Sequence, residues 1–85
     1  MSTADAPRRA LLRAADLRAA IAGLVDVPIE RLSDQANLIE HGIDSLRVIQ
    51  LAERWSRLTG RVVRFADLAA EPTLAAWARI VGVTA

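Results

Sequence analysis

The 85-residue sequence has no cysteine, no lysine and no tyrosine, and its only histidine is His41. Without cysteine the chain has no disulfide framework, no thiolate metal site and no cysteine nucleophile. One histidine is a poor basis for a metal cluster or a Ser-His-Asp triad. The aromatic residues are few, namely Trp55, Phe65 and Trp77, and the two tryptophans are expected in the core. We therefore expect neither a self-contained enzyme nor a metal site.

The sequence also lacks a long apolar run. No stretch approaches the roughly 20 apolar residues that cross a bilayer. Residues 1–7 lack the basic and apolar regions of a secretory signal. With 53% hydrophobic and 25% charged residues, the composition is typical of one small globular domain. We expect a cytoplasmic protein that does not associate with membranes.

The charges nearly cancel, at 11 basic against 10 acidic residues, but they are unevenly distributed. Residues 26–44 hold five acidic residues and one arginine, a balance of −4, whereas residues 45–64 hold five arginines and one glutamate, a balance of +4. This polarity favours oriented docking with a partner. It is not the continuous basic stripe typical of nucleic-acid binding, so nucleic acid is not an expected partner.

Hydrophobic periodicity predicts an all-α fold, a small four-helix bundle with three main helices and one short helix. The main helices are expected over residues 8–25, about 45–59 and 74–81, and the short helix over residues 65–70. The long loop 26–43 joins the first two main helices. Its expected apolar anchors to the core are Ile29, Leu32, Leu38 and Ile39.

The predicted helix 45–59 carries apolar residues on two sides. At about 100° per residue, its core face spans about 120° of arc. That face comprises Val48, Leu51, Ala52, Trp55 and Leu58. Leu46 and Ile49 fall outside this arc, Ser45 shares a face with Ile49, and Phe65 and Ala69 extend the same patch from the short helix. Because scattered exposed apolar residues are common, the pattern leaves two interpretations open, incidental exposure and an interaction surface.

Ser45 also has two interpretations from its position alone. Gly42 permits a sharp turn before the helix, and either Asp44 or Ser45 is suited to cap it. Alternatively, Ser45 is a modification site. A phosphate attached there would face the helix N-terminus, whose N–H groups and dipole stabilise an anion by about 0.3–1 kcal/mol.

Residues 37–46 read Asn-Leu-Ile-Glu-His-Gly-Ile-Asp-Ser-Leu, which resembles the phosphopantetheine-attachment motif of carrier proteins, with its core G-x-D-S-L. The resemblance covers roughly residues 10–81. Within the superfamily the chain is most similar to aryl carrier proteins of siderophore-type nonribosomal peptide synthesis. The residues that carry this likeness are Asn37 to Ile39, Asp44 to Arg47, Leu51 to Trp55, Phe65 to Ala69, Pro72-Thr73 and Ala76-Trp77.

The resemblance implies that a phosphopantetheinyl transferase moves a 4'-phosphopantetheine arm from coenzyme A onto Ser45, with Mg²⁺ held by the transferase. The arm's thiol would carry an aryl acid, of the salicylate or 2,3-dihydroxybenzoate type, as a thioester. An aryl-acid adenylating enzyme would load it, and a condensation or cyclisation domain would receive the acid. The protein itself would be a monomeric carrier, a substrate of its partner enzymes and not an enzyme.

The resemblance also implies which residues contact partners. Asp44 would be a recognition carboxylate beside Ser45. Ile49, Phe65 and Ala69 match the hydrophobic surface that downstream synthetase domains read. The expected partner-contact set is Asp44, Leu46, Arg47, Ile49, Phe65 and Ala69.

Some residues depart from related patterns. Ile43 replaces the second glycine of many peptidyl carriers, and His41 is expected to be an exposed loop residue. Fatty-acid carriers usually present an acidic second helix to basic partners, whereas this helix carries three arginines against Glu53. Those arginines are Arg47, Arg54 and Arg57.

Three alternatives remain open. A peptidyl or polyketide acyl carrier would bear the same arm with another cargo. A helical protein-interaction module would use Leu46, Ile49 and Phe65 for docking, with Ser45 unmodified. The weakest alternative is a nucleic-acid binder that uses the arginines of residues 47–64. We expect a discrete carrier domain over residues 7–82 with tails at 1–6 and 83–85, although a domain excised from a larger synthetase would look the same.

Overall fold

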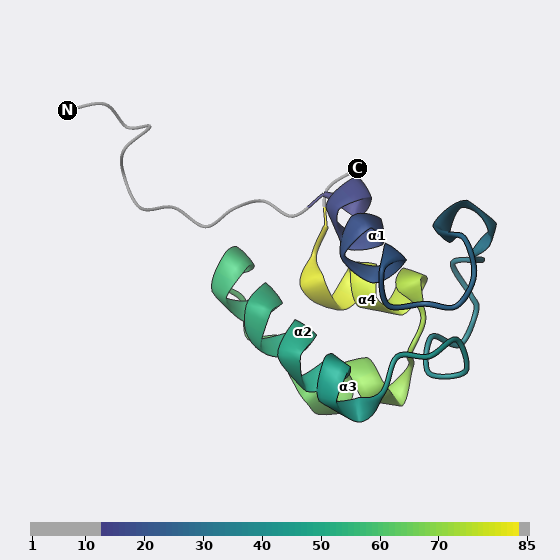
Figure 1. Ribbon diagram of the computed structural model, residues 1–85. Helices are drawn as coiled ribbons and strands as arrows, with labels where there is room; N and C mark the ends of the chain where they lie inside the picture. The colour runs from purple at the N-terminus through teal and green to yellow at the C-terminus, as the bar shows by residue number, and fades with distance from the viewer. Residues whose placement is uncertain (1–12, 84–85) are drawn as a thin grey trace.

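The computed structural model describes residues 13–83, and every described helix lies in this part of the chain (Figure 1). In chain order the elements are α1 (Ala14–Ala22), the 3-10 helix η2 (Ile29–Arg31), α2 (Ser45–Thr59), α3 (Phe65–Ala70) and α4 (Leu74–Val81). Between residues 13 and 83 there is no β-strand, and the predicted all-α fold is confirmed. The expected tail 1–6, the start of the first helix and residues 84–85 lie outside the described residues.

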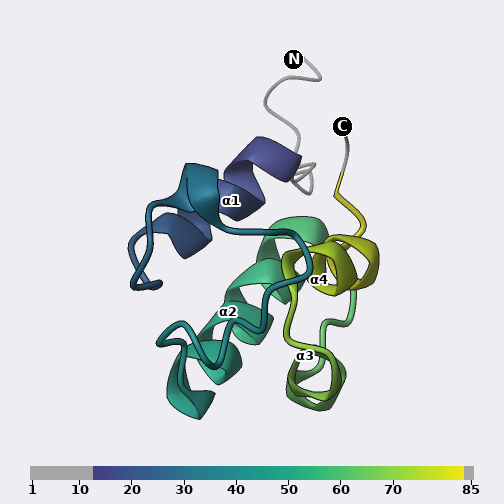
Figure 2. The same ribbon diagram turned by 90° about the vertical axis from the view of Figure 1, so that its right-hand side faces the viewer.

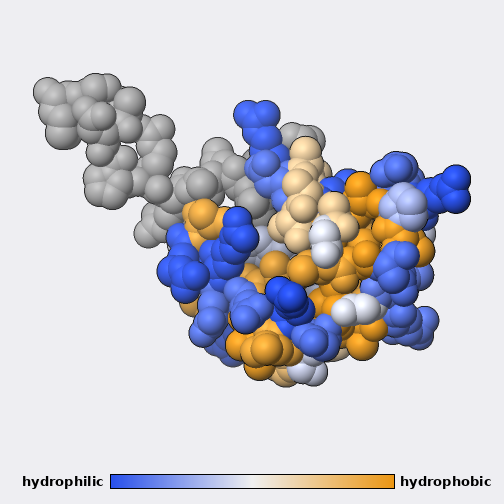
Figure 3. Space-filling model, in the orientation of Figure 1, coloured by the Kyte–Doolittle hydropathy of each residue, from blue (hydrophilic) through white to orange (hydrophobic). Residues whose placement is uncertain are grey.

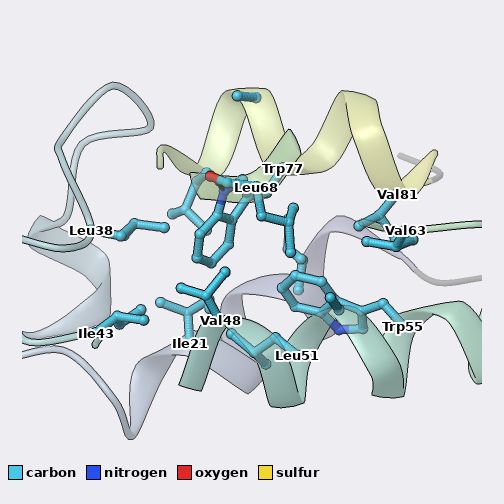
Figure 4. Close-up of a cluster of buried hydrophobic side chains, with 14 of the residues drawn as sticks. Ile21, Leu38, Ile43, Val48, Leu51, Trp55, Val63, Leu68, Trp77 and Val81 are labelled. Atoms are coloured by element: carbon cyan, nitrogen blue, oxygen red, sulfur yellow. Dashed lines mark hydrogen bonds between the residues drawn. The ribbon is translucent and has the colours of Figure 1, made fainter. Parts of the chain in front are cut away.

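The four α-helices enclose one apolar core, which the close-up in Figure 4 shows. Both tryptophans lie in it, as predicted, and so do side chains from every α-helix and from the long loop. The largest fully buried side chains are Trp55, Trp77, Ile21, Leu38, Ile43, Leu68, Val48 and Val81. Within the described residues no polar or charged residue is buried. The core is therefore held together mainly by apolar packing.

Helix α2 is the longest element, and local sequence defines both its ends. Asp44 caps its N-terminus, and Gly60 ends it in the left-handed conformation, with φ of 70°. Its predicted core face is confirmed, because Val48, Leu51, Ala52 and Trp55 are buried and Leu58 is half-buried. Helix α3 lies at the same end of the molecule as the start of α2 in both views (Figures 1 and 2).

The loop between α1 and α2 is anchored as predicted at Leu32 and Leu38, which are buried, and at Ile29, which is half-buried. The expectation for Ile39 is wrong, since 43% of this residue is exposed. The Asn37 side chain explains the difference. Its Oδ1 accepts hydrogen bonds from the backbone N–H groups of Ile39 (2.9 Å) and Glu40 (3.3 Å) and turns the chain outward directly after Leu38.

Backbone hydrogen bonds attach this loop to the connection between α3 and α4 and to the first turn of α4. The N–H of Leu38 donates to the carbonyl of Pro72 (2.7 Å), and the N–H of Ala75 donates to the carbonyl of Asp34 (3.0 Å). His41 is less exposed than expected, because its Nδ1 lies 2.9 Å from Asp26 Oδ1 while the Asp26 N–H donates to the His41 carbonyl (3.0 Å). The two ends of the loop are thereby joined just before α2.

Candidate functional site

Ser45 is the first residue of α2, and its neighbour Asp44 is the cap. The Asp44 backbone is extended, and its Oδ1 accepts a hydrogen bond from the Arg47 N–H at 2.9 Å. The structure thus decides between the two predicted caps in favour of Asp44. Ser45 is exposed, and its hydroxyl forms no hydrogen bond with any other described residue.

The other two serines in the described part of the chain have hydroxyls that are already engaged. Ser56 Oγ donates to the Val63 carbonyl (3.2 Å) and accepts from the Val63 N–H (3.0 Å), in a half-buried position. Ser33 Oγ accepts from the Gln35 N–H (3.1 Å) in the loop. Among residues 13–83, Ser45 therefore has the serine hydroxyl best placed for reaction with an external group.

Buried anchors on both sides fix where Ser45 lies. Gly42 turns the chain with φ of 105°, a conformation that favours glycine. Ile43 follows it and is fully buried, and Val48 on the first turn of α2 is fully buried as well. From the sequence we interpreted Ile43 only as the residue that stands in place of a second glycine. Its role as an anchor to the core was not predicted. With Ile43 and Val48 in the core, the start of α2 presents Ser45 to solvent.

Exposed apolar side chains surround this helix start, as predicted. The exposed fraction is 62% for Leu46, 42% for Ile49 and 40% for Phe65. Ala69 is also exposed, one turn after Phe65 on α3. These apolar residues are therefore not absorbed by the core, as an interaction surface would require.

The electrostatic surroundings of Ser45 fit an attached phosphodiester. Ser45 and Leu46 provide first-turn N–H groups, for which a helix has no internal acceptor. Arg47, also exposed, adds a positive charge on the same turn. The Asp44 carboxylate is engaged by the Arg47 N–H. A phosphate on Ser45 would thus lie at the positive end of a 15-residue helix.

Two further features of the described residues bear on the site. No group of three or more His, Cys, Asp or Glu side chains between residues 13 and 83 is arranged to hold a metal ion. Of the helices in this range, none is long and apolar enough to cross a membrane.

Residues 15–81 match the family described as "Phosphopantetheine attachment site". The chain belongs to this family, whose members carry 4'-phosphopantetheine covalently on a serine, and the predicted resemblance to carrier proteins is confirmed.

Several curated proteins contain a similar segment. The chain is 47% identical over 66 residues to the phenyloxazoline synthase MbtB of Mycobacterium sp. (strain MCS), an alignment that covers 78% of this chain and 6% of the relative. It is 43% identical over 63 residues to enterobactin synthase component B of Escherichia coli (strain K12), covering 74% of this chain and 21% of the relative. It is 32% identical over 79 residues to an isochorismatase of Bacillus subtilis (strain 168), covering 93% and 25%. The chain thus spans a quarter or less of the length of these relatives.

Proposed function

We propose that Ser45 is the attachment site for 4'-phosphopantetheine, and that the arm holds an aryl acid for siderophore-type nonribosomal peptide synthesis. The observation that carries this proposal is the exposed hydroxyl of Ser45, which has no partner in the described structure and starts a capped helix. Ser33 and Ser56, by contrast, use their hydroxyls within the fold.

The attachment is a balanced transfer from coenzyme A. The Ser45 oxygen forms a bond to the phosphorus that bears pantetheine, the pyrophosphate bond of coenzyme A breaks, and adenosine 3',5'-bisphosphate leaves. The hydroxyl proton passes to a base on the transferase, which is why this chain needs no base beside Ser45. Once attached, the arm supplies a terminal thiol, to which the acid is bound as a thioester.

The aryl cargo is supported by the relatives. A phenyloxazoline carries a phenyl ring on its heterocycle, and the synthase of that name contains a segment similar to this chain over 66 residues. The similarity to component B of enterobactin synthase supports the siderophore context of this assignment. We accordingly assign salicylate, 2,3-dihydroxybenzoate or a close analogue as the acid.

In this role the chain catalyses nothing itself. A phosphopantetheinyl transferase adds the arm, an aryl-acid adenylating enzyme loads it, and a condensation or cyclisation domain takes the acid. Asp44, Leu46, Arg47, Ile49 and the α3 residues Phe65 and Ala69 are the proposed contacts for these partners. The carrier domain comprises residues 7–82, acts as a monomer, and works in the cytoplasm, where coenzyme A is available.

The direct test is intact-protein mass spectrometry after incubation with coenzyme A and a transferase of broad specificity. We expect the mass of one phosphopantetheine to be gained by the native protein and by the controls Ser33→Ala and Ser56→Ala. Ser45→Ala should gain nothing. A gain that survives Ser45→Ala, or no gain on the native protein, would overturn the assignment.

The cargo is tested on the holo protein with adenylating enzymes for aryl acids, amino acids and other carboxylic acids. We expect salicylate- or 2,3-dihydroxybenzoate-adenylating enzymes to load it with the highest kcat/KM. Preferred loading with an amino acid would identify a peptidyl carrier instead. If the chain is instead an unmodified interaction module, incubation with coenzyme A and the transferase will change neither the mass of the protein nor its binding to partners.

A further inference from the structure

The turn formed by residues 37–43 leads directly into α2 and Ser45. Its backbone hydrogen bonds run mostly inside the turn. The carbonyl of Leu38, for example, accepts hydrogen bonds from the N–H groups of both His41 (3.1 Å) and Ile43 (3.2 Å). These bonds give the turn its shape, but they do not fix its orientation relative to the helices.

The orientation of this turn depends on its contacts with other segments. Leu38 and Ile43 are fully buried and attach the turn to the core. Because apolar packing is not directional, these two side chains hold the turn close without fixing its rotation. At the start of the turn, the hydrogen bond from the Leu38 N–H to the Pro72 carbonyl adds a direction. Near Ser45 a second directional contact is needed.

His41 makes that second contact, with Asp26. The two residues are bonded twice, through their side chains (2.9 Å) and from the Asp26 N–H to the His41 carbonyl (3.0 Å). Since a carboxylate only accepts, the His41 Nδ1–H is the donor to Asp26 Oδ1. We call this two-bond contact the loop clasp. Among the described residues, the loop clasp supplies the polar contacts of residues 40–43 with another segment.

The Asp26 side of the loop clasp is itself held in place. Val25 and Val27, on either side of Asp26, are half-buried and pack against the core. Just before them, the Leu24 N–H donates to the Ile21 carbonyl (2.8 Å). Figure 3 shows hydrophilic side chains along the right-hand edge, where the loop lies in Figure 1. The loop clasp thus links the end of α1, at the surface, to the turn before Ser45.

We propose that His41 and Asp26 are positioning residues for arm attachment, because the loop clasp holds the turn in the orientation that presents Ser45 to the phosphopantetheinyl transferase. The inference rests on the proposed function and adds to it two residues outside the proposed partner contacts. When a binding-competent orientation is populated less often, the apparent affinity falls in proportion. Breaking the loop clasp therefore raises the KM of the transferase for this protein and leaves kcat unchanged.

The ion pair of Arg18 and Asp34 provides a matched control. It also joins the region of α1 to the long loop, over 16 residues, where the loop clasp spans 15. The exposed side-chain fractions are similar, at 39% and 56% for Arg18 and Asp34 and 32% and 63% for His41 and Asp26. Asp34 precedes the turn, so loss of its side chain should leave the presentation of Ser45 unchanged.

The test measures KM and kcat for arm attachment from coenzyme A by a transferase of broad specificity. Asp26→Ala and His41→Gln break the loop clasp. His41→Asn keeps it, because asparagine places an amide N–H near the position of Nδ1, whereas glutamine places its amide near Nε2. We expect the two breaking variants to raise KM by about threefold to fivefold, as suits an exposed pair, with native kcat.

The same kinetics show whether the two residues act together. The double variant Asp26→Ala/His41→Gln should raise KM no further than either single change, since each already removes the same contact. His41→Asn should restore most of the native KM, and Asp34→Ala should match the native protein. In amide NMR spectra of the unmodified proteins, the signals of residues 42–45 should shift or broaden in the two breaking variants and not in Asp34→Ala.

Native KM values for both Asp26→Ala and His41→Gln would overturn the inference. So would a rise confined to the His41 variants, which would show that His41 contacts the transferase directly and that Asp26 has no part. Similar losses in His41→Asn and Asp34→Ala would show a general effect of altering the loop, and would also overturn it. A native protein that gains no arm from coenzyme A overturns the proposed function, whereas native kinetics in the breaking variants overturn this inference alone.

Discussion

The indole rings of Trp55 and Trp77 meet edge to face at the centre of the core, with centroids 5.8 Å apart and an interplanar angle of 67°. Trp77 also donates from Nε1 to the Leu68 carbonyl at 2.8 Å. These two contacts join α4 to α2 and α3, the helices that bear the candidate site. Through Trp77, the ring contact and the hydrogen bond together hold α3 beside α2.

Replacing Trp55 with alanine should strongly destabilise the domain. The side chain is 1% exposed, and its loss removes the ring contact and opens a cavity, at a cost of about 3–5 kcal/mol. Since small domains are stable by only about 5–15 kcal/mol, this change threatens folding. Urea denaturation followed by circular dichroism measures it. A loss below about 1 kcal/mol would contradict the packing described here.

Ile49→Asp should separate partner contact from folding. Because Ile49 is 42% exposed and lies outside the core face, we expect a change in the free energy of unfolding within about 0.5 kcal/mol. Transfer to the downstream domain should fall by about tenfold or more, as expected for a contact residue. Gln50→Asp, an exposed neighbour, adds the same charge as a control. Parallel loss of helicity and transfer would show that Ile49 serves the fold.

Two substitutions at Asp44 distinguish its cap from its charge. Asp44→Ala removes the acceptor for the Arg47 N–H and should cost about 1 kcal/mol, whereas Asp44→Asn, also a good cap, should cost far less. If the transferase recognises the carboxylate, both variants lose kcat/KM for arm attachment. Thermal unfolding and the transferase assay are measured on the same preparations. If Asp44→Asn has the same kcat/KM for arm attachment as the native protein, Asp44 serves only as the helix cap.

Ser56→Ala should destabilise the domain without affecting modification. The Ser56 hydroxyl bonds both backbone groups of Val63, and its loss leaves them unpaired beside the core, at a cost of about 1–3 kcal/mol. Ser33→Ala removes a single exposed hydrogen bond in the loop and is the matched control. Hydrogen exchange at the Val63 amide should accelerate in Ser56→Ala only. Unchanged exchange would show that this bridge does not hold the α2–α3 connection.

The candidate site was largely predictable because its signals are local. The Gly42 turn, the cap next to Ser45 and the periodicity that leaves Leu46 and Ile49 outside the core face depend on residues a few positions apart. The choice of Asp44 over Ser45 as the cap was not predictable, since both side chains suit that position. Only the observed hydrogen bond to Arg47 shows that the Ser45 hydroxyl is left available.

Contacts between distant residues explain what the sequence did not show. The expectation for Ile39 failed because alternation along a loop depends on its turns, and the Asn37 turn sends Leu38 inward and Ile39 outward. His41 pairs with Asp26, which is 15 residues away in the chain. Helical periodicity relates residues only a few positions apart, so it does not predict this contact.

By itself, the sequence determined the presence of four helices, the core face of α2 and the serine that begins it, because hydrogen bonding and hydrophobic periodicity within a helix act over a few residues. The end of the first helix was predicted at residue 25, and the structure places it at Ala22. The tertiary structure alone decided that Ile43 is an anchor, that Ser56 is engaged by Val63, and that His41 pairs with Asp26. These outcomes depend on the path of the long loop and on the packing of α3 and α4 against α2. That path is set by contacts between segments far apart in the chain.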